Sequence, residues 1–300
     1  MAPFLWLCLL VPAQVSGTRP QELQVSGIGG WGGRVVRGEP APVQIDLDNP
    51  GTEDRPVQLR VTWASTGPAQ YSAQPAWDQL SGRSGAIHES ALILPARSRK
   101  RISLALPAPE GDRHSLWVFA LNSKGRTLGV AEFPVRTVEP GKRLVAVVGR
   151  GSLSGLDKAG CEFSRVLPDE LPEESSAYHS LHALLWLDGR SGELRSPAQV
   201  DALTEWIHGG GHFLVSRSSA ADFGGSPVAA LLPVKLGTGR EFLLLDGLRS
   251  VVPPPDGRVV VLESTPLRGR VLLEQEEVPL VVEERRAGGR VTFIAFDVSR

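Results

Sequence analysis

The sequence predicts two domains, an antiparallel β-sandwich followed by an α/β domain whose sheet is mostly parallel. Short strand-like runs separated by turn residues fill residues 19–138. A strand, a capped helix, a glycine turn and a second strand span residues 183–216, and such a βαβ unit requires parallel strands. Between the two patterns, residues 139–143 form a polar hinge. With 300 residues, the chain can build a domain on each side of this hinge, over 19–138 and 144–300.

The first 17 residues resemble a secretory signal peptide. They carry no charged side chain, and Pro3–Val11 is apolar but short for a membrane span. Small residues that suit cleavage follow at Ala13 and Gly17. We therefore expect a secreted or periplasmic protein. A buried N-terminal strand and an uncleaved membrane anchor are the alternatives.

Composition excludes some classes of function. The net charge of −1 argues against general binding to nucleic acid, which requires a strongly basic face. If Cys8 leaves with the signal peptide, Cys161 is the single cysteine of the mature chain, so no intramolecular disulfide can form. No later apolar run reaches 18 residues, so we expect no transmembrane helix after the signal.

The predicted sandwich rests on seven short strands. In residues 57–63, apolar and polar side chains alternate, which is typical of a strand with one buried face. Seven such strands without a convincing helix favour an immunoglobulin-like sandwich. The expected strands are Leu23–Ile28, Val43–Leu47, Val57–Trp63, Glu89–Leu94, Arg101–Leu106, Ser115–Leu121 and Leu128–Val135.

Tryptophans raise the alternative of carbohydrate binding through this domain. Trp31 lies in the glycine-rich stretch 27–33, and Trp77 in the long irregular segment 65–86. Trp63 and Trp117 lie on alternating strands, where we expect them in the core. We interpret the Trp31 stretch as a turn with a packed tryptophan, and stacking on a sugar is the competing hypothesis.

The second domain is predicted from its βαβ unit. Ser196 caps the helix, Pro197 takes its first position and Gln199 completes a capping box. Glycines 209–211 end the helix before the strand His212–Ser216. The other expected elements are strands at Leu144–Val148, Val166–Pro168, Ala183–Leu187, Phe242–Leu245 and Val259–Leu262, a short helix at Pro227–Leu232, and a final hairpin of Val278–Glu283 and Arg290–Asp297.

These motifs resemble those of the class I glutamine amidotransferase-like superfamily, in particular its branch in bacterial envelope proteins. The motifs are Leu184–Asp188, Gln199–Ile207 and Gly209–Val215, and the likeness covers about residues 144–297. The resemblance implies a flavodoxin-like sheet behind a signal peptide and a β-sandwich. It also implies partners among envelope proteins and, because relatives often continue to a membrane helix, membrane association through a segment missing from this chain.

The catalytic residues of that superfamily have no counterpart here. Its members use a cysteine at a strand-to-helix elbow, activated by a histidine. The matching turn is Ser216–Ser219, which holds no cysteine, and no histidine follows His212. We therefore predict no catalytic residues. The candidates for facing a ligand are Asp188, at the carboxyl end of a strand, and Arg217 and Ser218, at the elbow.

Neither a cofactor nor a metal is predicted. The glycines after Val148 do not continue into a phosphate-binding motif. The pairs His179/His182 and His208/His212 have metal-like spacing, but neither has a clear carboxylate partner. We interpret these histidines as exposed polar residues.

The sequence thus favours a non-enzymatic binding or scaffold protein of the cell envelope, with a degenerate amidotransferase-like domain. Two alternatives remain open. One is a serine hydrolase that uses Ser218 or Ser219 with a histidine such as His179. The other is a carbohydrate-binding protein that acts through the tryptophans of the sandwich.

Overall fold

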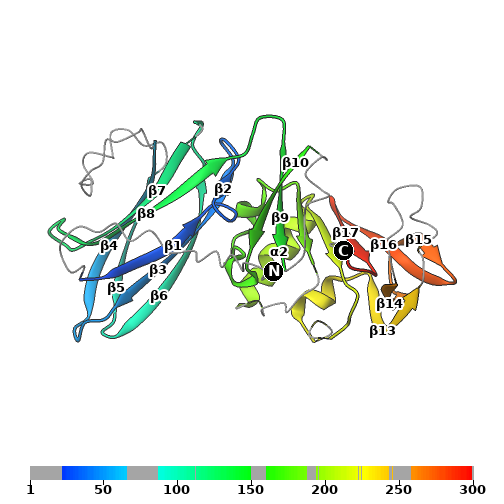
Figure 1. Ribbon diagram of the computed structural model, residues 1–300. Coiled ribbons are helices and arrows are strands. Elements are labelled where there is room, and N and C mark those ends of the chain that lie inside the picture. Colours follow the sequence, from blue (N-terminus) through cyan, green and yellow to red (C-terminus); the bar gives the residue numbers. More distant parts are fainter. Residues whose placement is uncertain are drawn as a thin grey trace, which may run out of the picture.

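The computed structural model describes residues 22–65, 87–111, 113–149, 160–187, 194, 196–221, 223, 225–242, 245 and 258–298. Within them the chain is mostly β and forms four sheets, of which the largest is mixed (Figure 1). The predicted signal peptide lies outside the described residues.

Two sheets make up the N-terminal part, residues 22–138. A three-stranded antiparallel sheet has the order β1-β3-β6, and a five-stranded sheet has the order β2-β8-β7-β4-β5. All seven predicted strands are present with somewhat different ends, and β2 is an additional short strand parallel to β8. The strands are β1 (Gln24–Gly29), β2 (Arg34–Val35), β3 (Pro40–Asn49), β4 (Arg55–Ser65), β5 (Ile87–Leu94), β6 (Ser98–Pro107), β7 (Arg113–Leu121) and β8 (Thr127–Thr137).

The two sheets share one apolar core. Strand β4 buries Leu59, Val61 and Trp63 in it, as its alternating pattern predicts. Strand β3 buries the odd-numbered residues 43–47 in the same core. The even-numbered Gln44 and Asp46 therefore lie on the outer face of the three-stranded sheet.

The predicted hinge is a tight turn. The Lys142 N–H donates to the Glu139 carbonyl at 3.0 Å, and the two side chains form an ion pair at 2.8 Å. Strand β9 begins at Arg143, directly after this turn.

A seven-stranded sheet organises the C-terminal part, residues 143–298. Its order is β10-β9-β11-β12-β17-β16-β15. The first five strands are parallel, and β16 and β15 complete it in antiparallel pairing, so the predicted parallel sheet and final hairpin are both present. The strands are β9 (Arg143–Val148), β10 (Cys161–Val166), β11 (Ala183–Trp186), β12 (His212–Ser216), β15 (Arg270–Gln275), β16 (Val278–Arg286) and β17 (Gly289–Ile294).

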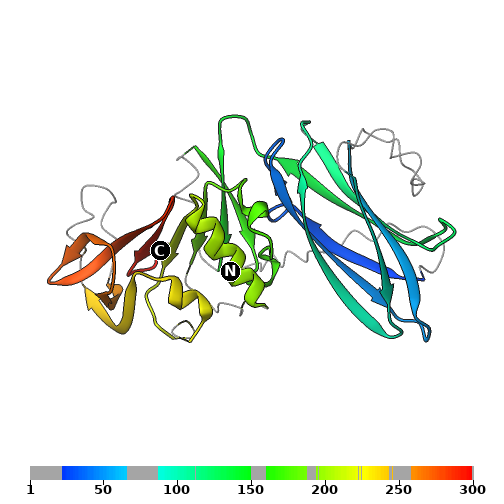
Figure 2. The same cartoon turned by 180° about the vertical axis from the view of Figure 1, so that it is seen from behind.

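Helix α2 (Pro197–His208) packs on one face of this sheet, which lies behind it in Figure 2. The Ser196 hydroxyl accepts from the Gln199 N–H, and the Gln199 side chain completes the predicted capping box. The helix buries Leu203, Trp206 and Ile207 against the sheet. A Cβ at Gly211 would lie 2.4 Å from the Trp206 ring, so this close packing requires glycine.

Three predicted elements differ from the structure. The strand expected at 166–168 is β10, which ends at Val166 because Pro168 begins a 3-10 helix, η1 (Pro168–Glu170). The helix expected at 227–232 is also a 3-10 helix, η3 (Pro227–Leu231). The strand expected at Phe242–Leu245 begins earlier, because β13 (Val234–Phe242) reaches Phe242 through two glycines and pairs with β14 (Val259–Pro266); residues 243 and 244 lie outside the described residues. A further 3-10 helix is η2 (Ser175–Tyr178).

Candidate functional site

The turn after β12 stands where the sequence predicts an elbow. Ser216, the last residue of β12, is fully buried. Its Oγ donates to the Phe296 carbonyl at 2.6 Å and accepts from the Val298 N–H at 3.0 Å. The hydroxyl therefore connects the carboxyl end of β12 to the segment that follows β17.

Arg217 is buried as well, with 2% of its surface exposed. Its guanidinium donates to the Ser219 and Ala221 carbonyls at 3.4 and 3.0 Å and lies 4.7 Å from the centre of the Phe223 ring. A buried guanidinium requires acceptors, and here the carbonyls of its own turn supply them. The side chain that we predicted to face a ligand is directed into the turn instead.

The structure describes one of the other two predicted residues. Ser218 is half-buried in the same turn, and Asp188 lies outside the described residues. His212 lies at the opposite end of β12 from Ser216, about 13 Å away at the usual rise of a strand. His179 is exposed and follows η2, which packs against α2 and β3. These placements do not bring Ser216 and His212 together.

The described tryptophans of the N-terminal part are buried. Trp31, Trp63 and Trp117 have exposed fractions of 1%, 1% and 5%, so none of them presents a ring for stacking on a sugar in this structure. Trp77 lies outside the described residues. The interpretation of Trp31 as a packed tryptophan is confirmed, but its packing partners belong to the C-terminal part.

Trp31 joins the two parts of the chain. Its indole N–H donates to the Ser180 hydroxyl at 3.1 Å, and its carbonyl accepts from the Ser164 hydroxyl at 2.6 Å. Its ring packs against Tyr178 with 5.2 Å between the centroids. Gly32 has a φ of +52°, and a Cβ there would lie 2.3 Å from the Arg165 carbonyl oxygen. The glycine-rich stretch thus allows the turn to approach β10 closely.

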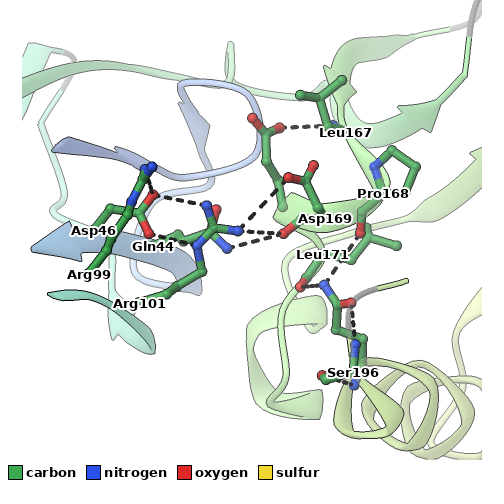
Figure 3. A network of polar contacts seen from close by, with 11 residues as sticks. Gln44, Asp46, Arg99, Arg101, Leu167, Pro168, Asp169, Leu171 and Ser196 are labelled. Carbon is green, nitrogen blue, oxygen red and sulfur yellow. Dashed lines mark hydrogen bonds and ion pairs between the residues drawn. The ribbon is translucent and has the colours of Figure 1, made fainter. Parts of the chain in front are cut away.

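A polar network extends this contact (Figure 3). The Arg101 guanidinium donates to both carboxylate oxygens of Asp46, at 2.8 and 2.9 Å, and Arg99 donates to the same carboxylate at 3.0 Å. Arg101 also faces Asp169 of η1, at 3.4 Å from its carbonyl and 3.9 Å from its carboxylate. Gln44 donates to the same carbonyl at 3.1 Å. We call this network, together with Trp31, Ser164, Tyr178 and Ser180, the central contact.

The network continues to the start of the helix. The Gln199 amide donates to the Pro168 and Leu171 carbonyls, at 3.3 and 2.7 Å, while its other atoms complete the capping box. Helix α2, η1 and β6 are therefore connected through buried or partly buried hydrogen bonds.

Electrostatics agree with this geometry. Hydrogen bonding to Arg101 lowers the pKa of Asp46 below its usual 3.8, and the same bond raises the pKa of Arg101. Burial raises the pKa of Glu170, whose carboxylate accepts from the Leu167 N–H at 2.8 Å. The central contact is thus a structural site in which charges are matched.

Within the described ranges, no group of three or more His, Cys, Asp or Glu side chains is arranged to hold a metal ion. The same part of the chain contains no helix long and apolar enough to cross a membrane.

Neither a protein-family model nor a curated protein matches the chain. Solved structures that match include the alkylpurine DNA glycosylase AlkC of Pseudomonas fluorescens bound to DNA, with 16% identity, a TM-score of 0.27, and coverage of 39% of this chain and 31% of that chain. The CARDB domain of the PF1109 protein from Pyrococcus furiosus matches with 13% identity, a TM-score of 0.27, and coverage of 39% and 85%. Spo0M, a sporulation control protein from Bacillus subtilis, matches with 7% identity, a TM-score of 0.29, and coverage of 39% and 50%. The chain thus spans less than a third of the glycosylase.

Sequence reasoning missed the central contact. Gln44 and Asp46 alternate with buried residues of β3, which predicts an outward direction, but the pattern does not say what that face meets. The glycines around Trp31 were the one available signal, because four glycines next to a tryptophan permit close approach to another segment.

Proposed function

We propose that this chain is a non-enzymatic binding or scaffold protein of the bacterial cell envelope. In this proposal an immunoglobulin-like sandwich precedes a degenerate amidotransferase-like domain with a flavodoxin-like sheet. The protein is secreted or periplasmic and acts by binding other envelope proteins.

The observation that carries the proposal is the turn after β12. In the superfamily that the sequence resembles, this position supplies the nucleophile. Here the Ser216 hydroxyl and the Arg217 guanidinium are both engaged by backbone groups of the turn and of the segment after β17. A hydroxyl that already donates to a carbonyl has no proton to give a general base without breaking that bond.

The central contact supports a scaffold role. Trp31 buries its ring in the apolar core of the C-terminal part, and Arg101 connects both parts through Asp46 and Asp169. Such a junction favours binding, because it holds surfaces on the two parts in a fixed orientation. A partner that binds both surfaces then loses no further conformational entropy in ordering them.

The serine-hydrolase alternative supplies the test. Purified protein is assayed for glutaminase, amidase and esterase turnover, and for labelling by a fluorophosphonate probe. We expect neither turnover nor labelling. Turnover that is lost in Ser218→Ala but retained in Ser103→Ala, a half-buried serine of β6, would overturn the proposal.

Localisation is tested separately. The full chain with a C-terminal tag is expressed in a Gram-negative host, the cells are fractionated, and the N-terminus of the recovered protein is determined. We expect periplasmic protein that begins after Ala13 or Gly17. Full-length protein confined to the cytoplasm would contradict the envelope assignment.

A further inference from the structure

Four cationic or ionisable side chains gather at the amino edge of the parallel strands. Arg143 begins β9, His182 precedes β11, His212 begins β12, and Arg290 is the second residue of β17. These strands are neighbours in the sheet. We call this group the amino-edge cluster.

Register places three of these side chains on one face. His212 pairs directly with Arg290, and Arg143 alternates with Leu144, whose side chain belongs to the core under α2. Arg143, His212 and Arg290 therefore project from the face opposite the helix.

The contacts within the cluster are close. Arg143 Nη1 lies 3.2 Å from His182 Nε2, and because a guanidinium only donates, this imidazole nitrogen accepts. This contact favours the neutral form of His182, in keeping with the lowering of its pKa. His212 Nε2 lies 3.0 Å from the Thr292 hydroxyl, on the strand that also carries Arg290.

Positive charge exceeds negative charge here. Among the described residues, the carboxylate that faces the cluster is Glu283 of β16, 3.9 Å from Arg290, and Arg270 of β15 also pairs with it at 3.3 Å. In the part of the chain that the structure describes, the guanidinium groups of Arg143, Arg270 and Arg290 outnumber this carboxylate. Arg285 of β16, which pairs directly with Arg290 in the sheet, adds a further positive charge.

The histidines respond to this excess. Burial and the Arg290 charge lower the pKa of His212 to about 4, with a smaller opposing effect from Glu283. Burial, followed by Arg143 and Arg290, lowers the pKa of His182. A bound anion would reverse the electrostatic part of both effects.

We propose that the amino-edge cluster is a binding site for a phosphate-type oxyanion, either free or as the phosphomonoester group of a larger ligand. This site is independent of the function proposed above, because it lies at the opposite edge of the sheet from the turn after β12.

The donors suit such a ligand. Two guanidinium groups supply paired N–H donors for oxyanions. Nε2 of His182 already contacts Arg143 and Nε2 of His212 already contacts Thr292, so each imidazole would donate to the anion from its second ring nitrogen. Arg143 is exposed and Arg290 is 47% exposed, so an anion can reach them from solvent. Because the anion favours the charged imidazoles, it binds more tightly as the pH falls through their range.

The experiment uses the full chain and inorganic phosphate as the probe. The pKa values of His182 and His212 are measured by NMR with increasing phosphate, against chloride at matched ionic strength. We expect a saturable rise in the pKa of His212 from about 4 toward its usual 6.5. We expect Arg143→Gln and Arg290→Gln each to weaken phosphate binding about tenfold or more.

The matched control is Arg258→Gln, which removes an exposed arginine directly before β14 and should leave the affinity unchanged. If neither histidine shifts saturably, or if the Arg143→Gln/Arg290→Gln double variant binds phosphate as the control does, the site does not exist.

Two further arms identify the source of the phosphate group. One measures binding to glycerol phosphate, and the other measures binding to phosphatidylcholine vesicles with and without phosphatidic acid. Binding to glycerol phosphate that the double variant loses supports a soluble ligand. Binding only to vesicles with phosphatidic acid, also lost in the double variant, supports a lipid head group. Binding of either kind that survives in the double variant would overturn the proposal.

Discussion

Arginines are arranged in opposite ways at the central contact and at the amino-edge cluster. At the central contact, Arg101 donates to Asp46 at 2.8 and 2.9 Å and reaches Asp169 of the other part. At the amino-edge cluster, Arg143 faces the imidazole of His182. At the central contact the arginines face carboxylates and carbonyls, whereas at the amino-edge cluster they face two imidazoles and share one carboxylate, Glu283.

This difference separates a structural site from a binding site. Arginines that are paired with carboxylates stabilise the folded chain and have few N–H donors left for a ligand. An unpaired cationic cluster destabilises the folded chain, and a bound anion can restore that stability. Removing a cation should therefore have opposite effects in the two regions.

The largest effect is expected at Trp31. Trp31→Ala removes a buried ring and the hydrogen bond to Ser180, so we expect a loss of about 3–5 kcal/mol in the free energy of unfolding. Urea denaturation followed by tryptophan fluorescence and circular dichroism measures this loss.

Trp31→Phe is the matched variant for this test. It keeps most of the ring contact with Tyr178 and loses the indole donor, so its cost should be clearly smaller. Equal stability of Trp31→Ala and the unaltered chain would show that the central contact does not form in solution.

Arg101→Gln should have the next largest effect. It leaves Asp46 with Arg99 alone and removes the link to Asp169, so we expect a loss of about 1–3 kcal/mol. The measurement is again urea denaturation. Arg99→Gln is the control, because its side chain is 61% exposed and the smaller loss of a surface ion pair is expected. Equal losses in both variants would contradict a special role for Arg101.

Acid should act on the two regions at different pH. The folded pKa of His212, about 4, lies below its usual 6.5, so the unfolded chain takes up this proton first as the pH falls. Its contribution to stability is complete above pH 6.5 and is lost progressively between 6.5 and about 4. The pKa of Asp46 is lowered below 3.8, so its contribution is lost only in still stronger acid.

Unfolding free energies measured across this pH range test the separation. His212→Gln should reduce the decrease in unfolding free energy between pH 6.5 and 4. Asp46→Asn should change the slope of unfolding free energy against pH only below pH 3.8. A His212→Gln chain that retains the full decrease would locate the responsible group elsewhere. Phosphate should also reduce this decrease if the amino-edge cluster binds it.

The smallest effect is expected for the Arg143→Gln/Arg290→Gln double variant. Removing two cations that face the exposed His182 and the half-buried His212 should leave stability unchanged or raise it by a few tenths of a kcal/mol. Thermal unfolding at neutral pH and low salt measures it. A loss as large as that of Arg101→Gln would mean that these arginines have a structural role, and the contrast between the regions would disappear.

The local sequence determined most of the secondary structure. Alternation in β4 and the capping box at Ser196 and Gln199 are short-range features, and both appear as predicted. Errors occurred where a short-range signal was ambiguous, as at Pro168 and at the glycines of β13.

Only the tertiary structure decided what the outward-facing side chains meet. Asp46 and Asp169 lie more than a hundred residues apart, and nothing in either segment predicts that Arg101 lies between them. The amino-edge cluster likewise exists because parallel strands bring Arg143, His182, His212 and Arg290 to one edge. Pairing between distant strands depends on the global packing of the chain, and for that reason the sequence predicted the strands but not these two sites.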